Sequence, residues 1–386
     1  MVLNKLAAAR PHPPVENVPL GLADGRVLAA DILSDRDNPP LARSIRDGYA
    51  VRSRDLPGEL EVIGEVAAGA YFAGNVGAGQ CVEIMTGAPV PPGVDAVVMV
   101  EYTSREGARM RTDKTPRPGE FINPQGSEAK AGGTVLRAGR RLGFAEIAMA
   151  ATVGCTQVPV FRRPSVAILS TGNEVVPVEQ TPEPNQVRNS NAWALAVQVR
   201  RAGGEPHMLP VAPDDYQDTR RLVEQGLNHD LLLLSGGVSA GKYDLVERVL
   251  ADCGAEFFFD RVLIQPGQPV VFGQARGKFF FGLPGNPAST MVTFELFGRA
   301  AVELLAGQTV SILATPFAQL THDFRHKKGL TRFLPALLTE DCRKVTPVSW
   351  QGSSDVPALS HANAFLVAEA DREEWLAGDW IQVLLR

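Results

Sequence analysis

The chain has 386 residues, of which 45% are hydrophobic, and its formal net charge at pH 7 is −5. A chain of this length exceeds one compact core and predicts two to four domains. No basic face stands out, which argues against a nucleic-acid binder, and no apolar run approaches the ~20 residues that span a membrane.

The first ten residues and the cysteines indicate the compartment. Met1 to Arg10 lack a long apolar segment, so we do not expect secretion. The cysteines are far apart in the sequence, and no two of them form a CxxC pair. They are Cys81, Cys155, Cys253 and Cys342. This spacing suits a reducing cytoplasm and gives no zinc signature.

The first part of the chain predicts an arm and a β-rich domain. Residues 1–28 are rich in proline with a short amphipathic stretch, which favours an extended arm over a core. From Asp31 to about Arg117, short strands alternate with glycine and proline turns, a pattern typical of a compact β domain. The expected strands are YAVRS, ELEVIGEVAAG, QCVEIMTG, DAVVMVEYT and ARMRT. Residues 118–163 hold a glycine-rich segment and an alanine-rich helix from Phe144 to Val153.

The second part of the chain alternates strands and helices before it returns to short strands. The expected strands are 165–170, 206–211, 231–235, 257–264, 269–273 and 278–282, and the expected helices are 191–202, 214–227, 243–253 and 287–305. This alternation predicts a doubly wound, mostly parallel α/β sheet. Residues 309–386 predict a small β-barrel or sandwich, with His322 and His326 on its solvated surface.

The chain therefore predicts a multidomain fold that combines α/β and β domains. Residues 1–30 and 118–163 form an extended linker or arm domain, and residues 31–117 form a β-rich domain. Residues 164–308 form the central α/β domain, and residues 309–386 form the C-terminal β-barrel domain.

Glycine-rich loops follow three apolar runs of the α/β region. They are VAILSTGNEVV (166–176), LLLLSGGVSAGKYDL (231–245) and FFFGLPGNPAS (279–289). Each predicts a buried strand, a tight turn and the start of a helix. Glycines let backbone N–H groups approach an anion, and a helix N-terminus adds positive potential. We therefore expect a phosphorylated ligand at the carboxyl ends of these strands.

Carboxylates accompany these loops. Glu174 follows the first strand, Asp214 and Asp215 begin a helix, and Asp244 follows SGGVSAGKY. Carboxylates that face phosphates usually need a hard cation, and Mg²⁺ prefers one or two carboxylates with phosphate oxygens and water. The alternative for Asp214 and Asp215 is plain helix capping, and for Glu174 a solvated loop acid.

Two further segments lie in the β-rich region. SIRDGYAV (44–51) contains Asp47, and MTGAPVPPGVDAVV (85–98) contains Thr86 at a strand end. On their own, both segments are typical of ordinary β-turns and identify no function.

The order RDGYAV, MTGAPVPPGVDAVV, STGNE, SGGVSAGKYD and GLPGNPAS resembles the MoeA/gephyrin-E family of molybdopterin molybdenumtransferases, from about Val15 to the C-terminus. The resemblance implies an enzyme that takes adenylylated molybdopterin and molybdate. It would hydrolyse the adenylate, insert molybdenum into the dithiolene and release AMP, with Mg²⁺ required. It also implies a homodimer of elongated four-domain subunits, a cleft to which the partner subunit contributes, and the molybdopterin adenylyltransferase as a partner.

The resemblance carries roles over to residues of this chain. It implies catalytic roles for Asp47, Thr86, Glu174, Asp214 and Asp244, with Glu174 and Asp244 as ligands of Mg²⁺. It also implies contacts to molybdopterin or to the oxyanion by a larger set of residues. These are Ser170, Thr171, Gly172, Asn173, Ser235, Gly236, Gly237, Ser239, Gln265, Gln268, Pro284, Gly285, Asn286, Pro287, Arg332 and Ser353.

The sequence departs from the family pattern at two places. Gln265 and Gln268 stand where the family often has lysines, and a neutral donor holds a dianion less well than an ammonium group does. We therefore expect weaker molybdate binding, unless Lys242, Lys278 or Arg332 compensates. The family's GEDI segment reads GSEA here, so that its acid survives only as Glu128.

Two alternatives stay open. The α/β domain alone would suit a nucleotide pyrophosphatase or adenylyltransferase, but such an enzyme would not need the RDGYAV and MTGAP region. The second alternative is a non-catalytic molybdopterin carrier or scaffold, which Gln265 and Gln268 suggest because they replace lysines of the family. Retention of Asp47, Glu174 and Asp244 argues against it, because a pure scaffold would not need these acids.

Overall fold

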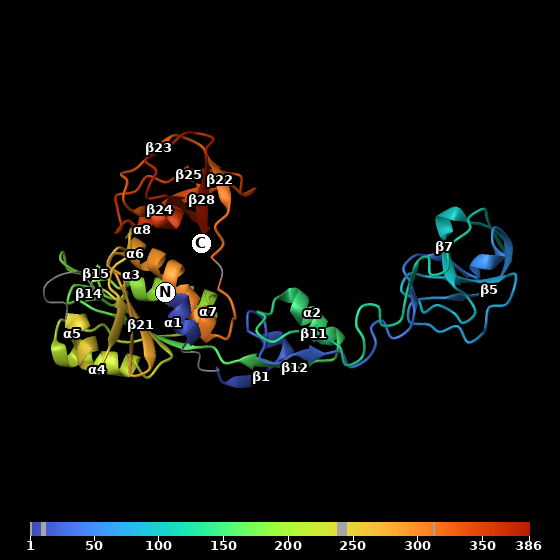
Figure 1. The fold of residues 1–386 in the computed structure, drawn as a ribbon, viewed down its shortest axis with the longest axis horizontal. Coiled ribbons are helices and arrows are strands. Elements are labelled where there is room, and N and C mark those ends of the chain that lie inside the picture. The colour runs from blue at the N-terminus through green and yellow to red at the C-terminus, as the bar shows by residue number, and fades with distance from the viewer. Residues whose placement is uncertain (1, 9–12, 238–244, 312) are drawn as a thin grey trace.

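The computed structural model describes residues 2–8, 13–237, 245–311 and 313–386. The molecule is elongated, with a β domain at one end, a narrow arm in the middle and an α/β domain with the C-terminal β domain at the other end (Figure 1). The chain runs outward along the arm, forms the distal β domain and returns along the arm before it builds the α/β domain (Figure 1).

The distal β domain is built on a six-stranded sheet in the order β7-β4-β6-β5-β9-β8. Its strands are β4 (Gly48–Val51), β5 (Gly58–Val66), β6 (Gln80–Ile84), β7 (Ala96–Met99), β8 (Ser104–Glu106) and β9 (Arg109–Thr112). The expected strands of this region are confirmed. Gly48 is needed because β4 and β7 approach closely: a Cβ atom there would lie 1.9 Å from Val98 O.

The arm is held together by strands that are distant in the sequence. β1 (Val15–Pro19) pairs with β12 (Gln157–Phe161), and β2 (Ile32–Leu33) pairs with β11 (Thr134–Leu136), both antiparallel. The alanine-rich helix is confirmed as α2 (Phe144–Thr152). The pairing of β2 with β11 crosses the boundary that we placed at residue 31, and the division into four parts stays a proposal.

The start of the chain differs from its prediction. Residues 2–8 are not extended: they form helix α1 (Val2–Ala8), which packs against α7 (Arg299–Leu305) of the α/β domain. Val2 and Leu6 lie one turn apart and are 8% and 3% exposed within the α/β core. Burial of these two apolar side chains explains why the amphipathic stretch joins a core.

The α/β domain has a six-stranded sheet in the order β16-β13-β17-β21-β20-β18, in which only β20 runs antiparallel to its neighbours. The strands are β13 (Ser165–Ser170), β16 (Glu205–Met208), β17 (Leu231–Ser235), β18 (Glu256–Phe259), β20 (Val271–Ala275) and β21 (Lys278–Leu283). One face is covered by α1, α3 (Ser190–Arg201) and α7, and the other by α4 (Tyr216–Gly226) and α5 (Leu245–Asp252). Helix α6 (Pro287–Thr293) contacts α3 and packs its buried side chains into a cluster with the C-terminal domain. The predicted doubly wound, mostly parallel sheet is confirmed.

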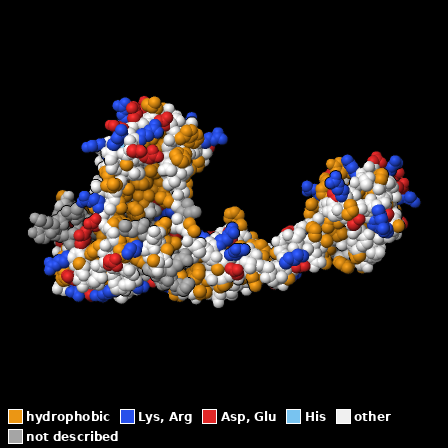
Figure 2. All heavy atoms as spheres, viewed as in Figure 1, with side chains coloured by type: hydrophobic (Ala, Val, Ile, Leu, Met, Phe, Trp, Pro, Cys, Tyr) orange, Lys and Arg blue, Asp and Glu red, His pale blue; other side chains and the backbone are white. Residues whose placement is uncertain are grey.

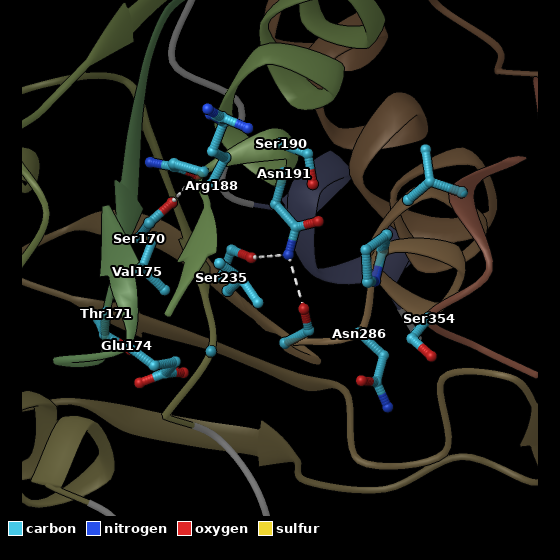
Figure 3. Close-up of a pocket in the computed structure, with 16 residues that line it drawn as sticks. Ser170, Thr171, Glu174, Val175, Arg188, Ser190, Asn191, Ser235, Asn286 and Ser354 are labelled. Carbon is cyan, nitrogen blue, oxygen red and sulfur yellow. Dashed lines mark hydrogen bonds between the residues drawn. The ribbon is translucent and has the colours of Figure 1, made fainter. Parts of the chain in front are cut away.

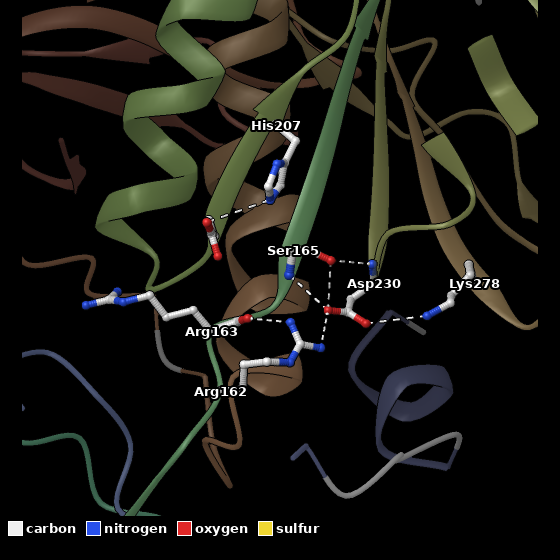
Figure 4. Close-up of polar contacts among 7 residues, drawn as sticks. Arg162, Arg163, Ser165, His207, Asp230 and Lys278 are labelled. Atoms are coloured by element: carbon white, nitrogen blue, oxygen red, sulfur yellow. Dashed lines mark hydrogen bonds and ion pairs between the residues drawn. The ribbon is translucent and has the colours of Figure 1, made fainter. Parts of the chain in front are cut away.

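A half-buried carboxylate ties the amino ends of three neighbouring strands together (Figure 4). Asp230, just before β17, accepts hydrogen bonds from Ser165 N, Ser165 Oγ and Arg162 Nη2 at 2.9, 3.0 and 2.8 Å. Lys278, the first residue of β21, lies 3.4 Å from the same carboxylate. Burial raises the pKa of Asp230, but the hydrogen bonds from Ser165 and Arg162 outweigh it, and the net shift is downward. Lys278 therefore pairs with Asp230 at the amino ends of the strands, away from the glycine-rich loops.

The C-terminal domain is a closed barrel. β24 (Thr331–Leu338), β25 (Lys344–Pro347), β22 (Phe317–Leu320), β28 (Trp380–Leu385) and β26 (Ala364–Ala368) pair in that order, and β26 pairs back to β24. Of the two forms that we expected, the barrel is therefore correct. Within the described ranges, every helix is too short or too polar to cross a bilayer.

One histidine of this barrel is buried, so its predicted place on the solvated surface is wrong. His326 is 9% exposed and stacks on Trp375, with ring centroids 5.2 Å apart. Its ring nitrogens lie 2.7 and 3.2 Å from Lys327 O and Glu369 O, and these backbone carbonyls can accept from a ring nitrogen that carries a proton. His322 is exposed, as expected.

Candidate functional site

A cavity of about 420 Å³ lies at the carboxyl ends of β13, β17 and β21. Its lining includes Ser170, Thr171 and Glu174 from the first glycine-rich loop, Ser235 and Gly236 from the second, and Gly285, Asn286 and Pro287 from the third (Figure 3). The three strands are neighbours in the sheet and run parallel, so their loops emerge at one edge. The expectation that the three loops share one site is therefore met by the geometry.

The glycines allow two of these loops to pack backbone against backbone. Gly236 and Gly237 have φ angles of 93° and 66°, in the region that disfavours side chains. A Cβ atom on Gly236 would lie 2.9 Å from Thr171 O, and one on Gly237 would lie 2.8 Å from Thr171 Oγ1. Glycine is therefore required at both positions. Gly236 N donates to Leu283 O at 3.2 Å, which ties the second loop to the end of β21.

Glu174 is the carboxylate of the cavity. Its side chain is exposed, and no hydrogen bond or ion pair of its carboxylate occurs among the described residues. The carboxylate lies over Gly172, where a Cβ atom would be 2.4 Å from Glu174 Oε2. One free carboxylate beside an anion cradle fits the ligand set that Mg²⁺ takes with phosphate oxygens and water. In the described part of the chain, no three His, Cys, Asp or Glu side chains form a metal-binding group.

The two aspartates before α4 have separate roles. Asp215 caps the helix, since its carboxylate accepts from Gln217 N and Asp218 N at 2.9 and 3.0 Å. Asp214 instead exchanges hydrogen bonds with Asn173 of the first loop: Asp214 N donates to Asn173 Oδ1 at 3.0 Å, and Asn173 N to Asp214 Oδ2 at 3.4 Å. The capping alternative thus holds for Asp215, and Asp214 supports the loop from behind without lining the cavity.

Other candidate residues lie near the cavity or outside the described ranges. Gly172, Asn173, Gly237 and Pro284 belong to the loops but are not part of the lining. Ser353 accepts a hydrogen bond from Ala288 N of α6 at 2.9 Å, next to the lining residue Ser354. Ser239, Lys242 and Asp244 lie outside the residues that the structure describes.

One wall of the cavity was not predicted from the sequence. Residues 187–191 line it, and Asn189 and Asn191 contact the serines that end β13 and β17 (Figure 3). The signal was present as the polar triplet NSN at the start of the expected helix 191–202. Ser354 and Val356, from the C-terminal domain, complete the lining.

The two glutamines lie at the junction between the α/β domain and the barrel. Gln265 belongs to β19 (Ile264–Gln265), which pairs with β24 so that Gln265 and Arg332 are register partners. Arg332 Nε is buried and has no hydrogen-bond partner among the described residues. Of the cations considered as substitutes for lysine, Arg332 is therefore next to Gln265, whereas Lys278 pairs with Asp230 at the opposite edge of the sheet.

Asp47 and Thr86 contact each other in the distal domain. Thr86 N and Thr86 Oγ1 donate to Asp47 Oδ1 at 2.6 and 2.8 Å. These two bonds, the backbone one first, hold the pKa of Asp47 below its ordinary value. The structure does not bring this pair to Glu174 within one chain, because β4 and β21 belong to domains at opposite ends of the molecule (Figure 1).

Comparison with known proteins accounts for almost the whole chain. Family models match residues 2–154 as the MoeA N-terminal region (domain I and II), 167–304 as a probable molybdopterin binding domain and 318–385 as the MoeA C-terminal region (domain IV). The chain is 35% identical to the molybdopterin molybdenumtransferase of Staphylococcus epidermidis over 97% of this chain and 92% of that one. It is 36% identical to that of Bacillus subtilis, over 93% and 87%.

Solved structures show the same fold. A crystal structure of the molybdopterin biosynthesis MoeA protein from Pyrococcus horikoshii OT3 matches with a TM-score of 0.81 at 28% identity, over 100% of this chain and 98% of that one. A second structure of the MoeA protein from this organism matches with a TM-score of 0.77 at 33% identity, over 100% and 97%.

Proposed function

This chain belongs to the MoeA family, and on that premise we propose that it inserts molybdenum into adenylylated molybdopterin and releases AMP. The observation that carries the proposal is the cavity at the carboxyl ends of β13, β17 and β21, where three glycine-rich loops meet. Glycine-rich loops between a strand and a helix N-terminus suit the phosphates of an adenylate. The curated relatives named molybdopterin molybdenumtransferase cover the same three regions of the chain.

Glu174, together with Asp244, would hold Mg²⁺ beside the adenylate. The free carboxylate of Glu174 in the cavity supports its part of this assignment. When bound there, the cation would polarise the phosphoanhydride and offset its negative charge. Asp214 would act by holding Asn173, and with it the first loop, in place.

Asp47 and Thr86 would reach the cavity of a partner subunit. They lie at the far end of the molecule from their own chain's cavity, which argues for a second copy that supplies them. Exposed apolar side chains flank the pair: Ile45 is 45% exposed, and Met85 is 43% exposed. Hydrophobic side chains also gather on the visible face of the distal domain (Figure 2), and apolar surface of this kind is typical of regions that another protein covers. A homodimer is therefore part of the proposal.

The molybdate would bind at the junction with the barrel. Arg332 supplies a guanidinium group whose buried Nε has no hydrogen-bond partner in the described part of the chain, and Gln265 lies beside it in the paired strand. The backbone carbonyl of Ser353 accepts from Ala288 N in the first turn of α6. Gln268 lies three residues after Gln265, and both glutamines can donate neutral hydrogen bonds. A cytoplasmic location and the molybdopterin adenylyltransferase as a partner complete the proposal and rest on the family alone.

The test is an AMP-release assay with purified protein, adenylylated molybdopterin and Mg²⁺, with and without molybdate. The proposal expects AMP release that depends on molybdate. AMP release that ignores molybdate would indicate a pyrophosphatase, and tight molybdopterin binding without AMP release would indicate a carrier or scaffold.

A further inference from the structure

Two asparagines at the start of α3 contact the two serines that end neighbouring strands of the cavity. Ser170 and Ser235 are register partners in β13 and β17, and each is 3% exposed. Ser170 Oγ lies 3.0 Å from Asn189 Oδ1, whereas Ser235 Oγ lies 2.9 Å from Asn191 Nδ2. Ser170 therefore contacts the oxygen of one asparagine amide, whereas Ser235 contacts the nitrogen of the other (Figure 3).

Backbone groups fix the orientation of both amides. Asn189 is the N-cap of α3, and its Oδ1 accepts from Ala192 N at 3.2 Å, which an amide nitrogen could not do. Asn191 Nδ2 donates to Gly285 O at 2.7 Å. A reversed Asn191 amide would place its oxygen against this carbonyl, which can only accept. The direction of each serine contact follows from these two constraints.

The serines consequently offer different groups to a ligand. Ser170 donates its hydroxyl hydrogen to Asn189, which leaves its lone pairs for the cavity. Ser235 accepts from Asn191, so its own hydrogen stays available, and no acceptor for it occurs among the described residues. A phosphate oxygen accepts hydrogen bonds but does not donate them when ionised, so it matches Ser235 and not Ser170.

We propose that Asn191 is a positioning residue for the ligand phosphate: it holds the Ser235 hydroxyl so that its hydrogen donates to a phosphate oxygen, and it fixes Gly285 of the third loop beside it. Asn191 Oδ1 is buried without a partner in the described part of the chain. The amide is thus placed entirely by what its nitrogen donates to. This inference rests on the proposed function only for the identity of the ligand, an adenylate.

The probe is AMP, and its affinity is measured by calorimetry for the unmodified protein, Asn191→Leu, Ser235→Ala and the double variant. Ser235→Ala removes the hydrogen bond to the charged phosphate, and Asn191→Leu removes the amide that orients the Ser235 hydroxyl. We expect each to lower AMP affinity by about tenfold or more. The double variant should lose about as much as the weaker-binding single variant, because both changes remove one contact. Losses that multiply would overturn the proposal.

A second comparison separates positioning from a general structural role. Adenosine carries no phosphate, so the ratio of AMP affinity to adenosine affinity should fall in Asn191→Leu. An equal loss for both ligands would show that Asn191 only supports α3, and would overturn the proposal. Ser170→Ala is the matched serine variant and should weaken AMP binding less than Ser235→Ala does; an equal loss would overturn the assigned directions.

Folding and the proposed function are controlled separately. Thermal unfolding shows whether each variant folds. If Asn191→Leu does not fold, Asn191→Ala replaces it, because alanine is smaller and has a good helix propensity. If the unmodified protein does not bind AMP, both the proposed function and this inference are contradicted. If it binds AMP and Asn191→Leu and Asn191→Ala bind equally well, only this inference is contradicted.

Discussion

Thr86 donates two hydrogen bonds to one carboxylate oxygen of Asp47, from its backbone N–H at 2.6 Å and from its hydroxyl at 2.8 Å. The sheet makes this contact possible, since β4 and β6 are antiparallel neighbours and Gly48 pairs with Ile84. Asp47 therefore presents an ionised, oriented carboxylate at the surface of the distal domain.

Substitution of Thr86 should release this carboxylate in part. Thr86→Val removes the hydroxyl bond and keeps the backbone bond, so the pKa of Asp47 should rise toward its ordinary value, as measured by carboxyl NMR titration. Because a lowered pKa keeps the acid ionised to lower pH, its protonation should begin at a higher pH in the variant. An unchanged titration would contradict a role for the hydroxyl. Thr152→Val is the control, because the Thr152 hydroxyl donates to Ala148 O within α2 of the arm.

Two inactive variants should complement each other. If Asp47 acts in the cavity of the partner subunit, a hybrid of Asp47→Ala and Glu174→Ala retains one cavity with both carboxylates. We expect each variant alone to lose AMP release and the mixture to regain part of it. The mixture is assayed after subunit exchange has been demonstrated by a tag on one variant. No recovery in exchanged dimers would place the site within one chain.

Restored lysines should strengthen oxyanion binding. A charge-assisted hydrogen bond contributes about 1.5–3 kcal/mol, against about 0.5–1.5 kcal/mol for a neutral one. Gln265→Lys with Gln268→Lys should therefore lower the molybdate concentration for half-maximal insertion by about tenfold or more. Arg332→Gln should raise it. A double lysine variant without effect, in a protein that already saturates at low molybdate, would show that another group holds the oxyanion.

Acid should weaken the α/β domain through a pair of histidines. His207 and His229 lie with ring centroids 4.6 Å apart, and burial first and then His207 lower the pKa of His229. Asp230 and Glu205 oppose this shift, and Lys278 adds to it. The unfolded chain then binds the proton more readily, so stability should fall as the pH drops below about 6.5.

His229→Gln should flatten this dependence between about pH 7 and 5 in thermal unfolding. His322→Gln, in the exposed part of the barrel, is the matched control and should leave the slope unchanged. A slope that persists in His229→Gln would assign the acid sensitivity to other groups.

Local patterns were sufficient to predict the α/β domain. The runs at 165–170, 231–235 and 278–283 are apolar, end in glycine-rich turns and precede helices, so strand, loop and topology follow from the sequence. The same reasoning placed Ser170, Ser235 and Gly285 at one edge. Asn191 was not predicted, because its role depends on the distance to loops 44 and 94 residues away.

The errors have the same origin. His326 is polar and lies in a basic run, but its burial depends on Trp375 and on carbonyls that only the barrel brings together. The pattern of residues 2–8 shows an amphipathic helix but not the surface of α7 that covers Val2 and Leu6. Such contacts between distant segments are fixed by tertiary packing and leave no local signal.

The measurement that tests the central claim most directly follows AMP release and molybdenum incorporation in one reaction. Purified protein is incubated with adenylylated molybdopterin, Mg²⁺ and molybdate; AMP is separated by chromatography, and molybdenum bound to the released pterin is measured by mass spectrometry. The account predicts that both products appear together in equal amounts and that neither forms in Glu174→Ala. AMP without molybdenum-bearing pterin, or the same yield from Glu174→Ala, would contradict it.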